Sequence, residues 1–577
     1  MSLSRRQFLQ LIGTAAAATA LPACTLMRSG SPDFERLYEQ PAYGDLTLLH
    51  LTDCHAQLNP VYFREPNINI GVGPMKNRVP HLVGEPFLRH FDIPAHTRDA
   101  YAFTYLEFVK AARTYGRLGG FAHIATLANY LRSQRPRGTL FLDGGDTWQG
   151  SPTALWTRGQ DMVDAQKLLG IDLMTGHWDF TYGAERIEQI INNDFKEHHI
   201  EFIAQNITDN TWGNLVFTPY VIRELNHIPV AIIGQAFPYT PIANPRYFTP
   251  DWQFGINERH MQKMVDKARA SGAQVVVVLS HNGMDVDLKM ASRVTGIDFI
   301  LGGHTHDAVP APSLVRNPAG RTFVINSGSH GKFLGVLDIK MSRRRVTGHR
   351  FSLLPVFSEV IPADQRMSEH IKRVRAPYRE RLDEHLATTG DLLYRRGNFN
   401  GTFDQVIVDA MMAVQDAPIA FSPGFRWGTS LLPGSSIRME DLMNQTAITY
   451  PTATITTYTG HQMKNVMEDI ADNLFNKNPY YQQGGDMVRT GGLTYTMDPG
   501  RDIGHRISDL RLANGKPVRP NAKYKVAGWA SVHKTPPGRP IWEVVADYLR
   551  HHRTVDIKAA YIPALKGISG NDGYEPI

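Results

Sequence analysis

The chain has 577 residues, 20% of them charged and 42% hydrophobic, and its formal net charge at pH 7 is +6. These proportions are those of a soluble globular protein, and the length exceeds one ordinary hydrophobic core, so two or more domains are expected. No run of lysines and arginines is long enough to follow a phosphate backbone, which argues against a nucleic-acid-binding protein.

Residues 1–24 are predicted to be an export signal. Arg5 and Arg6 precede a Phe-Leu pair and an alanine-rich stretch that is too short for a stable membrane span. This order is typical of the twin-arginine pathway, which exports folded proteins to the periplasm. The string "LPAC" resembles a lipoprotein cleavage box. It would attach a lipid anchor to Cys24, whereas cleavage after Ala20 or Ala23 would give a soluble periplasmic product.

From about residue 45, short β-branched apolar runs alternate with helical patterns. Such runs are typical of buried strands, and they lie at 47–55, 139–146, 229–237, 273–283, 297–306 and 322–331. Amphipathic patterns at 121–134 and 257–272 predict helices between them, and Gly272 is a natural helix stop. Strands that alternate with helices indicate a layered α/β domain, which we place at 45–358.

Polar residues follow these strands where each one ends. In α/β folds the ligand site lies outside the carboxyl ends of the strands, so these side chains are expected to converge. They are Asp53, His55, Asp146, His281, His304 and His306.

Three further segments complete the predicted organisation. An insertion at 59–118, rich in proline, arginine and aromatic residues, either shapes an entrance to the site or forms a structural flap. A charged stretch at 359–390, interrupted by Pro377, is predicted to be a bridging helix. Residues 391–577 have stronger strand signals and are predicted to form a second, α+β domain.

The converging residues suit two metal ions. Aspartate and histidine bind manganese, iron or zinc, and two neighbouring ions need a carboxylate that bridges them. Asp146 is the best bridge, because the glycines of "GGD" let the backbone turn sharply there. One ion would use Asp53, His55 and His306, and the other would use His177, His281 and His304. A hydroxide held between the ions would be the nucleophile, since metal binding makes water more acidic.

The strings "DCH", "GGDTWQG", "SHNG" and "GGHTH" resemble the calcineurin-like metallophosphoesterases. With "AQN" at 204–206, the bridging helix and the second domain, nearly the whole chain after the signal resembles the two-domain 5′-nucleotidase family. The resemblance implies an N-terminal four-layer α/β metallophosphoesterase domain and a C-terminal α+β domain that binds substrate. It also implies two manganese ions, with zinc or iron compatible with the same ligands: Asp53, His55, Asp146, His177, His281, His304 and His306.

Within that family, "GHWDFTYG", "SPGFRWGT", "QGGDMVRTGG" and the export signal are most similar to the thiosulfohydrolases of the periplasmic Sox sulfur-oxidation system. This resemblance implies hydrolysis of a cysteine S-thiosulfonate on the SoxYZ carrier protein, with release of sulfate. Arg426 falls where nucleotidases keep an arginine for the anionic group of the substrate, and a guanidinium fork suits a tetrahedral oxyanion.

The chain departs from the family's usual "GNHE" motif at the stretch "GHWD". His177 replaces the amide and remains a competent ligand, whereas Trp178 replaces a histidine that can protonate a leaving group. Hydrolysis of phosphate esters should therefore be impaired. A persulfide is a far better leaving group than an alkoxide and needs little protonation. The predicted catalytic residues are Asp146, His177, Trp178 and Arg426.

The main alternative is a periplasmic 5′-nucleotidase or sugar-nucleotide hydrolase, in which Phe425, Trp427 and Tyr495 would stack a nucleobase. A non-catalytic scaffold that kept the fold is a second alternative. Loss of metal ligands would favour that scaffold, and here none of the seven is missing.

Overall fold

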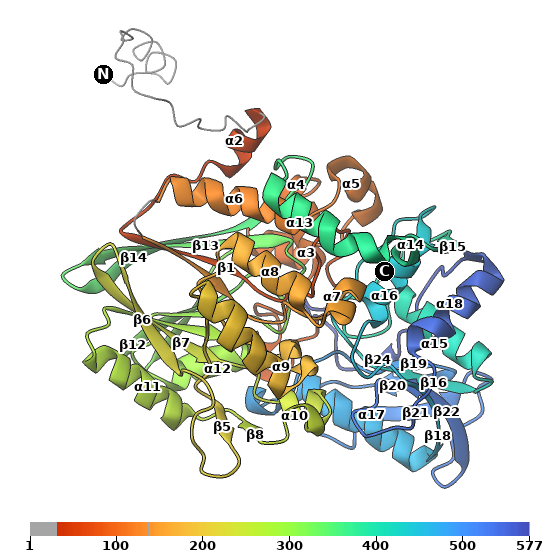
Figure 1. Cartoon of the computed structure of the whole chain (residues 1–577). Coiled ribbons are helices and arrows are strands. Elements are labelled where there is room, and N and C mark those ends of the chain that lie inside the picture. The colour runs from red at the N-terminus through yellow and green to blue at the C-terminus, as the bar shows by residue number, and fades with distance from the viewer. Residues whose placement is uncertain (1–31, 136–137, 576–577) are drawn as a thin grey trace.

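The computed structural model describes residues 32–135 and 138–575, and Figure 1 gives the path of the chain. The predicted signal at 1–24, with Cys24, lies outside the described residues. Within the described part, no helix combines the length and the apolar character needed to cross a membrane.

Two six-stranded sheets form the centre of the N-terminal domain. The first has the order β14 (Arg345–Pro355), β13 (Phe333–Ser342), β1 (Leu46–Leu51), β2 (Thr139–Asp143), β3 (Leu173–Met174) and β4 (Glu201–Phe202). The second has the order β11 (Ser313–Asn317), β12 (Gly320–Asn326), β10 (Phe299–Gly302), β9 (Val275–Ser280), β7 (Ile228–Gln235) and β6 (Tyr220–Leu225). The strands from β1 to β4, and β7, β9, β10 and β12, run parallel.

Side-chain alternation along the strands separates the layers. Leu46 and Leu48 of β1 pack between the two sheets, against β7, β9 and β10. Leu49 and Leu51 face the opposite way and pack on helices, which include α6 (Phe121–Ser133) and α8 (Gln160–Leu169). The outer face of the second sheet packs on α11 (Glu258–Ala270) and α12 (Met284–Arg293). This four-layer arrangement confirms the predicted α/β class, and strands occupy all six predicted runs.

The predicted bridging helix is shorter than 359–390. It consists of α13 (Gln365–Arg375) and α14 (Arg379–Leu382), with a 3-10 turn at Pro377 between them. The proline has no N–H for the helical ladder, so the helix breaks there. Residues His385–Thr389 instead form β15, which pairs with strands β17 (Ser436–Arg438) and β23 (Thr554–Val555) of the second domain.

The C-terminal domain mixes short sheets with four helices, as predicted for α+β. Its four-stranded sheet has the order β18 (Ala453–Thr459), β22 (Lys523–Trp529), β16 (Ile419–Ser422) and β19 (Arg489–Gly491). A three-stranded sheet has the order β21 (Ile507–Leu512), β20 (Leu493–Met497) and β24 (Ala564–Leu565). The helices are α15 (Thr402–Val414), α16 (Met439–Thr446), α17 (Gly460–Phe475) and α18 (Ile541–His552).

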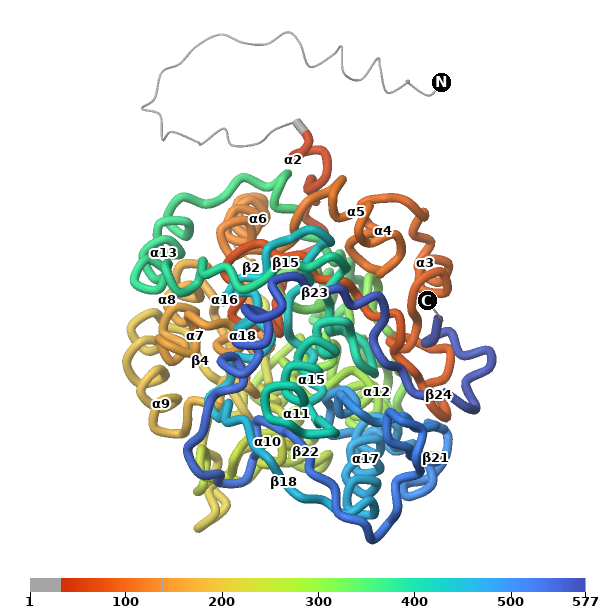
Figure 2. Tube along the Cα trace, turned by 90° about the vertical axis from the view of Figure 1, so that its right-hand side faces the viewer, coloured from red at the N-terminus to blue at the C-terminus, as the bar shows by residue number. Residues whose placement is uncertain are grey.

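The insertion at 59–118 folds into three short helices, α3 (Gly84–His90), α4 (Arg98–Phe103) and α5 (Phe108–Tyr115). Figure 2 shows the last described residues of the chain, in blue, beside α3. The amide of Val83 donates to the carbonyl of Asp572, and Asn571 donates to the carbonyl of Gly71. The insertion therefore joins the N-terminal domain to the last residues of the chain.

Candidate metal centre

A tight turn after β2 presents Asp146. The turn places Asp146 at φ 57°, and the preceding Gly145 has φ 96° with no room for a β-carbon against Gly176. The Oδ1 atom of Asp146 accepts a hydrogen bond of 2.6 Å from the amide of Trp178. Its Oδ2 atom lies 3.1 Å from Nε2 of His281 and 3.3 Å from Nδ1 of His177.

Asp179 holds this turn in place. Its Oδ2 atom accepts from the amides of Asp146 (2.9 Å) and His177 (3.2 Å), and its Oδ1 atom accepts from those of Thr147 (3.1 Å) and Trp148 (2.9 Å). Burial, together with the charge of Asp146, raises the pKa of Asp179 to about 6. It is therefore ionised at neutral pH, the state in which both oxygens accept hydrogen bonds.

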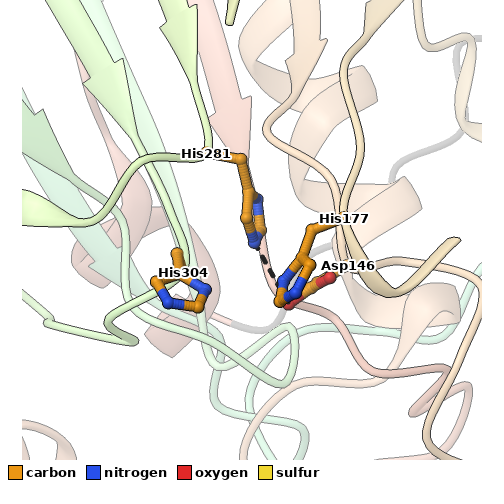
Figure 3. Close-up of side chains that lie close together, drawn as sticks. All are labelled: Asp146, His177, His281 and His304. Carbon is orange, nitrogen blue, oxygen red and sulfur yellow. Dashed lines mark hydrogen bonds and ion pairs between the residues drawn. The ribbon is translucent and has the colours of Figure 1, made fainter. Parts of the chain in front are cut away.

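The structure brings all seven predicted ligands together in two groups that share Asp146. In each group the ligand atoms lie within 4.8 Å of one another, and every member is buried. The first group, drawn in Figure 3, consists of Asp146, His177, His281 and His304, which point toward one another from four different loops. The second group consists of Asp53, His55, Asp146 and His306.

Hydrogen bonds behind the histidines orient two of them. Nδ1 of His281 donates to the carbonyl of Gly144 at 2.6 Å, and Nδ1 of His55 donates to the carbonyl of Gln149 at 3.2 Å. In both rings Nε2 is left to face the carboxylates, which is the arrangement by which proteins fix a metal-binding tautomer.

The charge state of the cluster fits metal ions. Nε2 of His177 and of His304 is buried and lacks a hydrogen-bond partner, and Nε2 of His281 faces the carboxylates of Asp146 and Asp53. Burial and nearby positive groups hold the pKa of His304 and of His306 well below the ordinary value, so both imidazoles are neutral, the form that binds metals. Burial would lower the pKa of His281, but the carboxylates of Asp146 and Asp53 outweigh it and raise that pKa to about 10.

A cavity of about 370 Å³ opens onto this centre between the two domains. Five of the seven ligands line it, together with Trp178, Phe425, Arg426, Trp427 and the loop Gln483–Asp486 of the C-terminal domain. Of the described residues that line it, none belongs to the insertion at 59–118. The insertion lines other cavities, and two of these also border the ligands His306 and His304, so both predicted roles of the insertion stay open.

Trp178 is 8% exposed and joins the hydrophobic core of the C-terminal domain. It makes edge contacts with Phe425 and Trp427, at centroid distances of 5.4 and 5.0 Å. Phe425 and Trp427 stack directly on each other at 4.0 Å and 17°. The three rings thus form one packed wall of the cavity.

The structure places Tyr495 elsewhere. It lies on β20 and is buried in the core of the C-terminal domain with Met467 and Met497, and it does not line the cavity. The expectation that it stacks a substrate ring is therefore corrected. Its neighbours Leu493 and Met497 show the reason, because β20 buries alternate side chains and Tyr495 falls on the buried face.

Arg426 lies beside the centre, but its guanidinium already makes polar contacts with other residues of the protein. One terminal nitrogen donates to the carbonyl of Gly485 at 2.7 Å and the other to that of His304 at 3.4 Å, while Nε lies 3.6 Å from Asp486. Arg396 reaches the same region and donates to the carbonyl of Thr305 at 2.8 Å. The sequence arguments missed Arg396, Gly484 and Asp486, although the Gly-Gly-Asp string signalled a close backbone approach.

Known proteins share this architecture. Residues 387–534 match the family model described as 5′-nucleotidase, C-terminal domain. A 5′-nucleotidase of Bos taurus is 25% identical over 460 residues, which cover 71% of this chain and 76% of that protein. The structure of SoxB, a sulfate thiohydrolase of Thermus thermophilus, superimposes with a TM-score of 0.87 at 37% identity, covering 92% of this chain and 98% of that one. A 5′-nucleotidase precursor of Thermus thermophilus has the same fold, with a TM-score of 0.72 at 22% identity and coverage of 90% and 99%.

The four-layer domain, the paired Asp/His groups and the second domain define a two-domain metallophosphoesterase, a class of metal-dependent hydrolases. The chain belongs to the SoxB family within the two-domain 5′-nucleotidases.

Proposed function

We propose that the protein is a periplasmic thiosulfohydrolase that releases sulfate from a cysteine S-thiosulfonate carried by the SoxYZ carrier protein. Water attacks the sulfonate sulfur, an S–O bond forms and the S–S bond breaks. The products are sulfate, a cysteine persulfide anion on the carrier and two protons. The observation that carries the proposal is Trp178, which occupies the place of a proton donor and presents an indole ring that cannot supply a proton.

Two divalent ions, which we propose to be manganese, would be held by the two groups that share Asp146. When bound they would supply Lewis acidity and make water more acidic. The chain's own residues set the rest of the chemistry. Arg426 lines the cavity beside the centre, where a guanidinium suits an incoming sulfonate. The proposed catalytic residues are thus Asp146, His177 and Arg426, and Trp178 forms part of the aromatic wall of the cavity.

The aromatic wall supports this substrate over a nucleotide. A nucleobase that stacks between two rings needs a gap of one ring thickness between them. Phe425 and Trp427 are already in face-to-face contact at 4.0 Å, which leaves no such gap. Tyr495 is buried in the domain core. A cavity between domains, open to the surface and partly apolar, instead suits a peptide arm with an anionic tip.

The test compares native protein with Trp178→His and Trp178→Phe. Native protein should release sulfate from a cysteine peptide carrying S-thiosulfonate and should hydrolyse AMP poorly. Trp178→Phe keeps an apolar ring without a donor and should retain most of the sulfate release. Trp178→His restores a proton donor and should raise phosphomonoesterase activity about tenfold or more.

Metal content is measured on the same samples, so that loss of ions is not mistaken for loss of chemistry. Efficient AMP hydrolysis by the native protein would contradict the proposal. So would the absence of sulfate release from metal-loaded protein, and either result would favour the phosphoesterase alternative.

A further inference from the structure

The loop Gly303–Asp307 carries two of the candidate metal ligands in a strained conformation. His304 has φ 73° and His306 has φ 59°, backbone angles that residues other than glycine rarely adopt. Such strain persists only where surrounding contacts hold the backbone in place. From the N-terminal domain, the carboxylate of Asp53 accepts from the amide of His304 at 2.9 Å. Gly328 of the same domain donates to the carbonyl of Asp307 at 3.0 Å, and the carbonyls of His304 and Thr305 accept from the other domain.

Three residues of the C-terminal domain touch this loop. Arg396 donates to the carbonyl of Thr305 at 2.8 Å, and Arg426 donates to that of His304 at 3.4 Å. Gly484, at φ 81°, lies so close to the ring of His304 that a β-carbon there would sit 1.9 Å from Nε2. Backbone and guanidinium groups from one domain thus fix the position of a metal ligand in the other.

Asp486 ties these contacts together. Its carboxylate is fully buried and lies 3.8 Å from Arg396, 3.6 Å from Arg426 and 3.1 Å from Arg489. It follows Gly484 and Gly485 directly, so the residue that neutralises the arginines also places the glycine loop over His304. Asp307, which lies 3.8 Å from Arg396, shares with Asp486 the compensation of these guanidinium charges.

We propose that Arg396, Arg426, Gly484 and Asp486, which we call the buttress, complete the metal site of His304 from the C-terminal domain. The ion held by Asp146, His177, His281 and His304 is retained only while the buttress is in contact with the loop. Metal retention at this site therefore reports the docking of the two domains. Retention of the ion held by Asp53, His55, Asp146 and His306 depends much less on the buttress. The inference rests on the ligand groups proposed above and is independent of the substrate.

The sharpest test uses two adjacent glycines. Gly484 and Gly485 both have positive φ, 81° and 77°, so alanine strains the backbone equally at either position. A β-carbon at Gly484 meets His304, whereas at Gly485 its nearest neighbour is the carbonyl of Gly424 at 3.7 Å. The full-length variants are stripped with a chelator and titrated with Mn²⁺ by calorimetry, and bound metal is counted by elemental analysis.

Gly485→Ala should bind two ions with native affinities. Gly484→Ala should bind one ion as tightly as native protein and the other about tenfold more weakly or worse, the usual scale for a displaced supporting contact. Equal affinities in the two variants would overturn the proposal. Sulfate release plays no part in this measurement, so an error in the proposed substrate leaves the test intact.

A second pair tests the arginines. Arg396→Met removes the donor to Thr305. Arg395→Met removes a neighbouring buried arginine that pairs with Asp404 and donates to Gln445, all within the C-terminal domain. Both variants lose a buried guanidinium, but only Arg396→Met should weaken the affinity for the ion held with His304, by about tenfold or more. Unchanged affinity for both ions in folded Arg396→Met would also overturn the proposal. If that variant fails to fold, the glycine pair decides.

Discussion

At the scale of single residues, the centre is built from backbone conformations that most sequences avoid. Five of the seven candidate ligands have positive φ: Asp53, His55, Asp146, His304 and His306. Each lies two to four residues beyond the end of its strand and must turn its side chain inward over that short distance. The strain is held by side chains that accept several backbone amides at once, and Asp179 is the clearest case because it accepts four.

Asp179→Asn should impair both folding and catalysis. Asparagine offers one acceptor oxygen and one NH₂ group, so two of the four buried amides lose their partner at about 1–3 kcal/mol each. The Asp146 turn should loosen, and kcat should fall about tenfold or more while bound metal decreases. Urea unfolding and kinetics on metal-analysed samples measure the two effects.

The matched control is Asp209→Asn. Asp209 also accepts three backbone amides, from Thr211, Trp212 and Asn214, but on an exposed hairpin that does not line the cavity. Its variant should keep native kinetics. If Asp179→Asn behaves like this control, the assigned role of Asp179 is wrong.

At the scale of elements, a buried lysine ties the insertion at 59–118 to the core of the N-terminal domain. Lys332 is fully buried, and its ammonium group donates to the carboxylate of Glu65 at 2.5 Å and to the carbonyls of Phe63 and Ala102. These three acceptors all belong to the insertion, whereas Lys332 belongs to the N-terminal domain core. Burial lowers the pKa of Lys332, and Glu65 opposes that shift.

Lys332→Met should destabilise the protein by about 3–5 kcal/mol, because it leaves Glu65 buried without a counter-charge. The double variant Lys332→Met with Glu65→Leu removes both charges and should recover most of that loss. Denaturant unfolding of the three proteins at one metal concentration gives the comparison. A single variant within about 1 kcal/mol of native protein would show that the pair does not anchor the insertion.

Local sequence signals predicted some element boundaries better than others. The strand ends that carry Asp53, Asp146 and His281 were predictable, because apolar β-branched runs and the glycines after them are local features. The side of β20 that Tyr495 occupies was also encoded, since Leu493, Tyr495 and Met497 alternate with threonines. The length of the bridging helix was overestimated, because charge patterning continued past the break at Pro377.

At the scale of the whole molecule, metal binding, folding and protonation are linked. The carboxylates that face His281 raise its pKa to about 10 in the metal-free protein, above the value of about 6.5 expected in an unfolded chain. The bound proton therefore stabilises the metal-free fold fully below pH 6.5, and this contribution is lost as the pH rises through about 10. A metal ion has to displace that proton to bind Nε2.

Mn²⁺ affinity should thus increase by about tenfold per pH unit between pH 6.5 and 7.5, with close to one proton released per chain. Competitive titration at the two pH values and an indicator dye in weak buffer measure these quantities. Chelation should lower the melting temperature, and saturating metal should restore it. Metal at 100 times its Kd should add about 2.7 kcal/mol to the free energy of unfolding. Affinity independent of pH, or binding without proton release, would contradict the assigned charge state of His281.

The sequence by itself determined the layered fold and the set of residues that could hold metal ions. Strand ends of parallel sheets meet at one edge, so residues some 250 positions apart were expected to converge, and Asp146 lies in both groups. Only the tertiary structure decided how the second domain meets that edge. Trp178 in the C-terminal core, the closed stack of Phe425 and Trp427, and Gly484 over His304 are contacts between distant segments. Such contacts depend on how two domains dock, and docking leaves no periodicity in either segment from which it could be predicted.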